Sequence, residues 1–89
     1  MAKKKSSNPL GPQQIVIADR GWVYVGNATE CSDRVTITSA RSIRYCGTAR
    51  GLGELAESGP TATTKLDPIG TVVVPMRAVI GIIACKSAW

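Results

Sequence analysis

RSIRYCGTARGLGELAESG, residues 41–59, is the stretch that decides the predicted fold, because it changes from strand to helix. Residues 41–46 alternate in character, which predicts a β-strand. The glycines of GTARGLG then predict a turn. Apolar residues recur beyond it at helical spacing, at Leu52, Leu55 and Ala56. This spacing predicts one short helix near residues 52–58, and Gly59-Pro60 predicts its end because proline cannot continue a helix.

The sequence before residue 41 predicts β-structure throughout. Two apolar runs, residues 15–17 and 22–25, are separated by the turn sequence Asp19-Arg20-Gly21 and predict a hairpin. Residues 34–38 alternate strictly between polar and apolar side chains. This alternation predicts a half-buried strand that continues through a short link into residue 41.

The sequence after residue 59 also predicts strands. Residues 67–70, DPIG, predict a turn, and residues 71–74 predict the strand that follows it. Residues 76–85 are the most apolar part and predict a last strand, kinked near Gly81 and buried on both faces. We therefore expect a mainly β fold, a small antiparallel barrel or sandwich of five to six strands with one short helix.

The chain divides by composition at residue 14. Residues 1–14, MAKKKSSNPLGPQQ, predict a basic flexible N-terminal arm, and residues 15–89 predict a single β-rich domain. Two interpretations of the arm stay open. It makes capsid or nucleic-acid contacts through Lys3, Lys4 and Lys5, or it is a solubilising tail without a specific partner.

Size and cysteine usage predict a homo-oligomer. A chain this small buries only ~60% of the surface of its unfolded form, so its core is marginal without a supplement. The three cysteines have no paired spacing and there is no histidine, which excludes the common zinc patterns. The odd count and the lack of a secretory signal indicate reduced thiols in a cytosol. No apolar run reaches the ~20 residues of a membrane span, so we expect no membrane partner.

The residues give little support to catalysis. Without histidine, and with six scattered acidic residues and no nucleophile motif, we expect no enzyme, no catalytic residue, no metal and no cofactor. The turn GTARGLGE lacks the GK[ST] ending of a Walker loop and the GxGxxG dinucleotide fingerprint. Binding is the remaining chemistry. The net charge of +5 favours acidic partners, such as phosphates, nucleic acid or an anionic surface.

The predicted ligand site is the stretch in which arginines, an aromatic residue and glycines come together. Arginine forks and glycine-rich backbone are suited to phosphate, and an aromatic ring can stack on a base or ribose. The site residues expected here are Arg41, Arg44, Tyr45, Thr48, Arg50 and Gly51. Glu54 opposes an anion there. In the alternative interpretation, the glycines form a tight strand-to-helix connection and the arginines are solvated.

The motif Arg-x-Ile-Arg-Tyr, the glycine turn, Leu-x-x-Leu-Ala and the apolar strand ending near a cysteine resemble a family of small phage and prophage proteins of unknown function. The resemblance covers roughly residues 15–85. It is carried by Arg41, Ile43, Arg44, Tyr45, Gly51, Leu52, Leu55, Ala56, Gly59 and Cys85. Cys46 stands where the family pattern has tryptophan, so stacking at that position is not expected here. The resemblance implies a viral origin and no particular mechanism.

Three functions follow as hypotheses. The first is a phage-encoded, non-enzymatic, homo-oligomeric protein in the host cytoplasm that binds a phosphorylated small molecule and sequesters a host immune signalling nucleotide. The second is a virion structural protein, a capsid decoration or minor structural subunit, with the basic arm and Trp89 in subunit contacts. The third is a nucleic-acid-binding protein that uses the arm.

Overall fold

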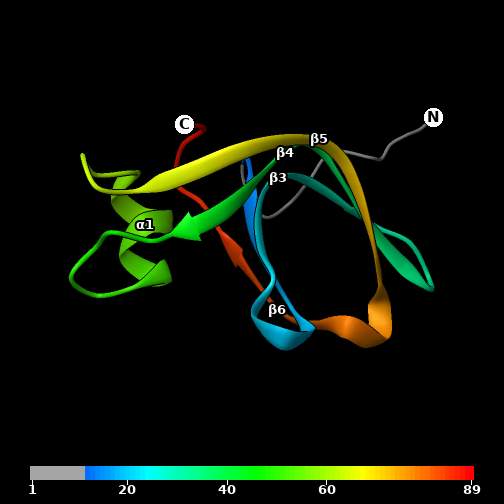
Figure 1. The fold of residues 1–89 in the computed structure, drawn as a ribbon. Helices are drawn as coiled ribbons and strands as arrows, with labels where there is room; N and C mark the ends of the chain where they lie inside the picture. Colours follow the sequence, from blue (N-terminus) through cyan, green and yellow to red (C-terminus); the bar gives the residue numbers. More distant parts are fainter. Residues whose placement is uncertain (1–11) are drawn as a thin grey trace.

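The computed structural model describes residues 12–89 and shows a mainly β fold with one short helix (Figure 1). A single antiparallel sheet has the strand order β5-β4-β3-β2-β6. The elements are β2 (Gln14–Ala18), η1 (Asp19–Gly21), β3 (Val23–Glu30), β4 (Arg34–Tyr45), α1 (Leu52–Ser58), β5 (Lys65–Pro75), η2 (Met76–Ala78) and β6 (Val79–Ala84). The mainly β class is confirmed, and the sheet is curved but not closed into a barrel.

The sheet is a meander whose last strand returns to its first. Strands β2 to β5 follow one another as antiparallel neighbours, and β6 then pairs with β2, with Ile15 opposite Ile83. Strands β5 and β6 therefore form the two edges of the sheet. Figure 1 shows β4 and β5 running from α1 at one side of the molecule to η2 at the other.

Irregular pairing bends the long strands at mid-length. The β3–β4 register shifts between Val25 and Asn27, and the β4–β5 register shifts on both sides of Ala40. Ser39 has a φ of 51°, a conformation that few non-glycine residues adopt. At Gly26, a Cβ would lie 2.8 Å from the Thr38 carbonyl oxygen, so only glycine fits there without a shift. We call this region the bend.

The bent sheet builds two small cores from its two faces. Neighbouring residues of β2 alternate between them, as Ile15 packs into one core and Val16 into the other. The first core lies inside the curl and holds Val16, Ala18, Ala28, Val35, Ile37, Ala40 and Val74. The second core lies under α1 and holds Ile15, Val25, Leu55, Ala56 and Cys85. Strands β2 and β3 contribute buried residues to both cores, which joins the two into one domain.

Local signals in the sequence located the hairpin and the helix correctly. The turn Asp19-Arg20-Gly21 is η1, and it joins β2 to β3. The predicted helix near residues 52–58 is α1, and Gly59 ends it with a φ of 85°. Strand β2 begins at Gln14, and Gln13 and Gln14 are buried, so this end of the predicted arm is built into the domain. The part of the arm with the three lysines lies outside the described residues.

Two predictions for the last third of the chain are wrong. The turn at residues 67–70 is absent, because Pro68 and Gly70 pair with β4 as members of the continuous strand β5. An edge strand tolerates proline, since one side of it needs no partner. The strand over residues 76–85 is divided into η2 and β6. It is not buried on both faces, because β6 is an edge and Ile80 is 70% exposed.

Candidate functional site

Arg44, one of the predicted site residues, lies at the end of β4 and pairs with Asp67 of β5. Its Nε donates to Asp67 Oδ2 at 2.8 Å, and its second nitrogen lies 3.4 Å from Oδ1. The hydrogen bond from Arg44 lowers the pKa of the Asp67 carboxyl, and Asp67 in turn raises the pKa of Arg44. A fork-to-carboxylate pair of this kind uses the donors that a phosphate would need.

Arg50 is also engaged by acidic residues, although its side chain is 73% exposed. Its Nε lies 3.6 Å from Glu54 Oε1, and a terminal nitrogen lies 3.9 Å from Glu57 Oε1. Its backbone N–H donates to Glu54 Oε1 at 3.0 Å. Glu54 and Glu57 therefore place negative charge beside the one arginine of the glycine-rich turn, which disfavours an anion there.

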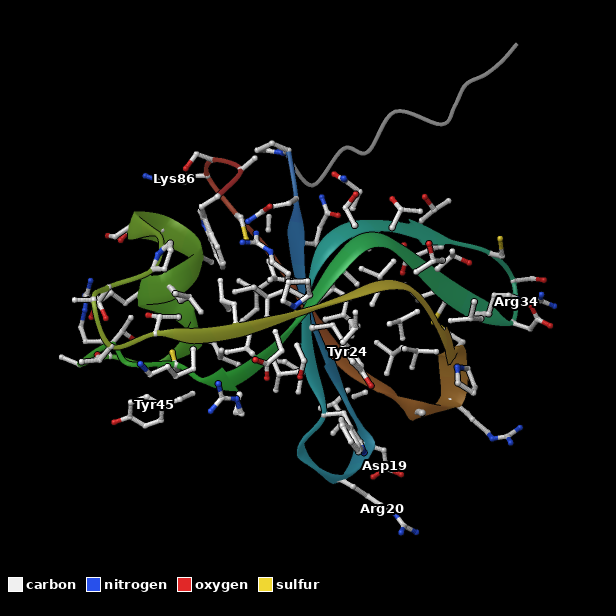
Figure 2. The ribbon with its side chains drawn as sticks, turned by 45° about the horizontal axis from the view of Figure 1, so that its top comes forward. Asp19, Arg20, Tyr24, Arg34, Tyr45 and Lys86 are labelled. Atoms are coloured by element: carbon white, nitrogen blue, oxygen red, sulfur yellow. The ribbon has the colours of Figure 1, made fainter. Side chains whose placement is uncertain are left out.

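Thr48 and Gly51 build the turn itself. The Thr48 hydroxyl donates to the Gly51 carbonyl at 2.6 Å and lies 3.1 Å from the Cys46 sulfur. Gly51 precedes α1 with a φ of 80°, and a Cβ there would meet open space, so its glycine is needed for conformation and not for close approach. Tyr45 is exposed, and Figure 2 shows its ring directed away from the body of the molecule. Thr48, Arg50 and Gly51 thus share one turn.

Arg41, the remaining predicted residue, lies apart from the others. Arg41 and Arg44 are three positions apart on one strand, so their side chains leave opposite faces of β4. The Arg41 guanidinium donates to the Trp89 carbonyl oxygen and lies 5.4 Å from the centroid of the Trp89 ring, which is a cation–π distance. Among residues 12–89, Arg41 is the one Lys or Arg that is not exposed, and no Asp or Glu side chain there forms an ion pair with it.

Arg41 lines a cavity of 480 Å³ at the bend. The lining comes from β3, β4, β5 and both ends of the described chain, and comprises Gln13, Gly26, Asn27, Ser39, Ala40, Arg41, Pro68, Gly70 and Trp89. We call this space the bend cavity. It holds a cation, two carboxamides, a hydroxyl and an indole ring, and no acidic side chain contributes to its lining.

Two buried nitrogens among the residues that line the bend cavity have no hydrogen-bond partner within residues 12–89. They are the Gln13 side-chain amide and the Trp89 indole N–H, and the Gln13 residue is only 5% exposed. Buried donors are normally satisfied, so such atoms mark a place where an acceptor is missing. Among the lining residues, Arg41, Asn27 and Ser39 supply hydrogen-bond donors, which suit an anion or a carbonyl-rich ligand.

Sequence reasoning found Arg41 but missed its partners in the cavity. Gln13 belonged to the predicted arm, and no local motif marks Asn27 or Ser39, because the strand register alone brings them to the bend. Trp89 was singled out as an exposed aromatic for subunit contacts, whereas the structure packs it half-buried against the second core. Only a knowledge of the β2–β6 pairing could have brought Gln13 and Trp89 together.

The described residues include no group of three or more side chains arranged to hold a metal ion. No helix in residues 12–89 has the length and apolar character required to span a bilayer. Comparison with protein-family models, curated proteins and solved structures gives no match for this chain.

Proposed function

We propose that the chain is a non-enzymatic binding protein that holds a small phosphorylated molecule in the bend cavity. Arg41 carries this proposal. It is the one described cation that is partly buried, no Asp or Glu side chain of residues 12–89 pairs with it, and it lines a cavity of 480 Å³. That volume falls within the ~300–1,000 Å³ of small-molecule sites. In this proposal Arg41 binds phosphate, Trp89 packs on a base or ribose, and Gln13 donates to an acceptor.

Of the six site residues expected from the sequence, this proposal keeps Arg41 as the residue that binds phosphate. Arg44 and Arg50 serve the fold, because Asp67, Glu54 and Glu57 engage them. The lining of the bend cavity contains hydrogen-bond donors and no acidic side chain, which suits a protein that sequesters an anionic ligand. Holding such a ligand without cleaving it needs no general base or nucleophile. The ligand class that we propose is a cyclic or ADP-ribose-derived signalling nucleotide of the host, and the carrier is a phage-encoded homo-oligomer.

Thermal shift and calorimetry of the full chain against cyclic dinucleotides, ADP-ribose, ATP and inorganic phosphate test the proposal. A ligand present at 100 times its Kd stabilises the folded state by about 2.7 kcal/mol, which is easily measured as a rise in Tm. We expect Arg41→Gln to weaken binding by about tenfold or more, because a hydrogen bond to a charged group is worth about 1.5–3 kcal/mol.

Arg44→Gln is the matched control, since it removes an arginine from the same strand but outside the bend cavity. Arg41→Lys keeps the charge and shows whether the planar fork is required if Arg41→Gln disturbs Trp89. Absence of any shift across the panel would contradict the proposal. So would equal losses of affinity in the Arg41→Gln and Arg44→Gln proteins when both melt like the parent chain.

A virion structural protein is the second candidate, and the exposed edges of the sheet support it. Both β5 and β6 end the sheet with apolar side chains in solvent, at Ile69, Val73 and Ile80. Surfaces of this kind suit assembly into a larger particle. Mass spectrometry of purified virions separates the candidates, since a sequestering protein should be absent from the particle and a decoration subunit should be abundant.

A further inference from the structure

Within residues 12–89, the sheet ends at β5 on one side and at β6 on the other. The backbone of β5 pairs with β4 on one side, and the backbone of β6 pairs with β2 on one side. The outer side of each strand has no strand partner among residues 12–89. Such an edge presents N–H and C=O groups that can pair with another strand.

Each edge has part of the usual protection, from Lys65 and two prolines on β5 and from a register shift at Ile80 on β6, but one segment of each strand has neither charge nor proline. Natural edge strands are shielded by charged side chains, above all lysine, or by proline. On β5, residues 69–74 are IGTVVV and contain neither, because Pro68 and Pro75 flank this segment. On β6, Val79–Ala84 is VIGIIA and is likewise uncharged. The two unprotected segments are of equal length.

Exposed apolar side chains accompany both edges. Val73 on β5 is 56% exposed, and Ile80 on β6 is 70% exposed. Beside Val73 lies an apolar groove of 270 Å³, whose walls include Trp22, Tyr24 and Pro75. The rings of Trp22 and Tyr24 are parallel within 5° and their centroids are 6.4 Å apart. The groove therefore adjoins the segment of β5 that contains Val73, and Asp19 and Arg20 complete its lining.

We infer that β6 of one copy of this chain adds antiparallel to β5 of a second copy, with Ile80 of the first seated in the groove beside Val73 of the second. This inference rests on the homo-oligomer of the proposed function and names the strands that join its copies. The strand that adds to β5 belongs to a second copy because the chain itself carries both complementary surfaces. One is the β5 edge with its groove, and the other is the β6 edge with the exposed Ile80. Backbone pairing supplies hydrogen bonds, and the groove fixes the register.

The interface is heterologous, because it joins two different surfaces. Each copy in such a pair still has one free edge, so the sheet continues from copy to copy until a ring closes or a filament grows. A β5–β5 or β6–β6 pair would instead stop at two copies and would leave either the isoleucine or the groove without its complement.

Native mass spectrometry and sedimentation of the full chain test the inference without any ligand. The parent chain should be a ring or larger assembly at high micromolar concentration. Val73→Lys blocks the β5 edge and Ile80→Lys blocks the β6 edge, so each variant alone should be monomeric. Mixed together they should form a one-to-one heterodimer, since each variant supplies the edge that the other has lost. Tyr45→Lys is the matched control, as Tyr45 is 60% exposed and lies on neither edge, and it should assemble like the parent.

Three results would overturn the inference: a monomeric parent chain, variants that assemble like the parent, or variants that stay monomeric when mixed. Circular dichroism melts should first establish that each variant is folded. Loss of binding by Arg41→Gln with assembly intact, or the reverse, distinguishes failure of the ligand proposal from failure of the interface.

Discussion

Arg41 and Arg44 belong to the same short motif and the same strand, yet the structure places them in opposite situations. Arg44 leaves β4 toward Asp67 and is neutralised in solvent. Arg41 leaves the other face, lies against Trp89 and lines the bend cavity. The motif that looked like one cationic cluster is thus divided between two regions, the turn before α1 and the bend.

The difference teaches that neighbouring arginines form an anion site only when no carboxylate reaches them first. Around the turn, Asp67 of β5 pairs with Arg44, and two glutamates of α1 lie within ion-pair distance of Arg50. At the bend, the strands supply amides, a hydroxyl and backbone, and no acid. The acids decide which arginines are available, and their positions follow from strand pairing.

The largest expected effect comes from removing the anchor of α1. Leu55 is fully buried in the second core, so Leu55→Ala should lower the free energy of unfolding by about 2–5 kcal/mol. Urea denaturation measures it, and Leu52→Ala, at a half-buried position of the same helix, should cost clearly less. Equal losses at the two positions would show that α1 is not anchored as described.

Glycine substitutions compare the two regions directly. At the bend, Gly26→Ala places a Cβ 2.8 Å from both the Ile37 side chain and the Thr38 carbonyl, which should destabilise by about 1–3 kcal/mol. In α1, Gly53→Ala meets open space and should stabilise by up to about 1 kcal/mol, because alanine favours helix. Thermal denaturation reports both signs. A neutral Gly26→Ala would mean that β3 and β4 can separate at the bend.

Because Cys85 is buried in the second core, the free energy of unfolding should depend on pH in the alkaline range. Burial raises the pKa of its thiol, although the nearby Gln13 side chain has a smaller effect in the opposite direction. The thiol of the unfolded chain ionises near pH ~8.5, so Cys85 stabilises the fold fully below that pH and progressively less as the pH rises through the folded-state value. Urea denaturation from pH 7 upward should show a shallower decline in Cys85→Ala, whereas exposed Cys31→Ala should keep the parent slope.

The smallest expected effect concerns Asp67. Arg44 lowers the pKa of the Asp67 carboxyl, so the pair stabilises the fold above the unfolded carboxyl pKa of ~3.9 and loses that contribution as the pH falls through the folded value. Asp67→Asn should therefore flatten the acid limb of a pH–Tm curve slightly, with little change near neutrality because the pair is exposed. Asp33→Asn, at the opposite end of β4, should flatten the acid limb to a similar small extent, because Arg34 likewise lowers the pKa of Asp33. An acid limb left unchanged by Asp67→Asn would show that Arg44 does not hold this carboxyl ionised.

Short-range patterns predicted the parts of the fold that short-range forces determine. The leucine spacing gave α1, and the Asp19-Arg20-Gly21 turn gave the first hairpin, because each depends on a few consecutive residues. The turn assigned to residues 67–70 failed since pairing with β4 overrides the local preference of proline and glycine. Propensity is a weak guide wherever a neighbouring strand supplies the hydrogen bonds.

The candidate site was harder to predict from the sequence than the fold was. Arg41 could be named because arginine beside an aromatic motif is visible in a sequence. Its separation from Arg44 depends on alternation in β4, and the Arg44–Asp67 contact depends on a register with several shifts. No spacing rule predicts such shifts, so the carboxylates that occupy Arg44 and Arg50 could be suspected but not located.

The pairing of β2 with β6 has a consequence for how quickly this chain can fold. Ile15 contacts Ile83 only after the two ends of the described chain have come together. The chain therefore loses loop-closure entropy before it gains the free energy of this contact. Folds dominated by such distant contacts cross their kinetic barrier in milliseconds to seconds, far more slowly than helical domains of equal size. A nascent chain that lacks residues 79–84 leaves Ile15 and Val16 of β2 without their partners in β6, so this part of the sheet can mispair until β6 has been synthesised.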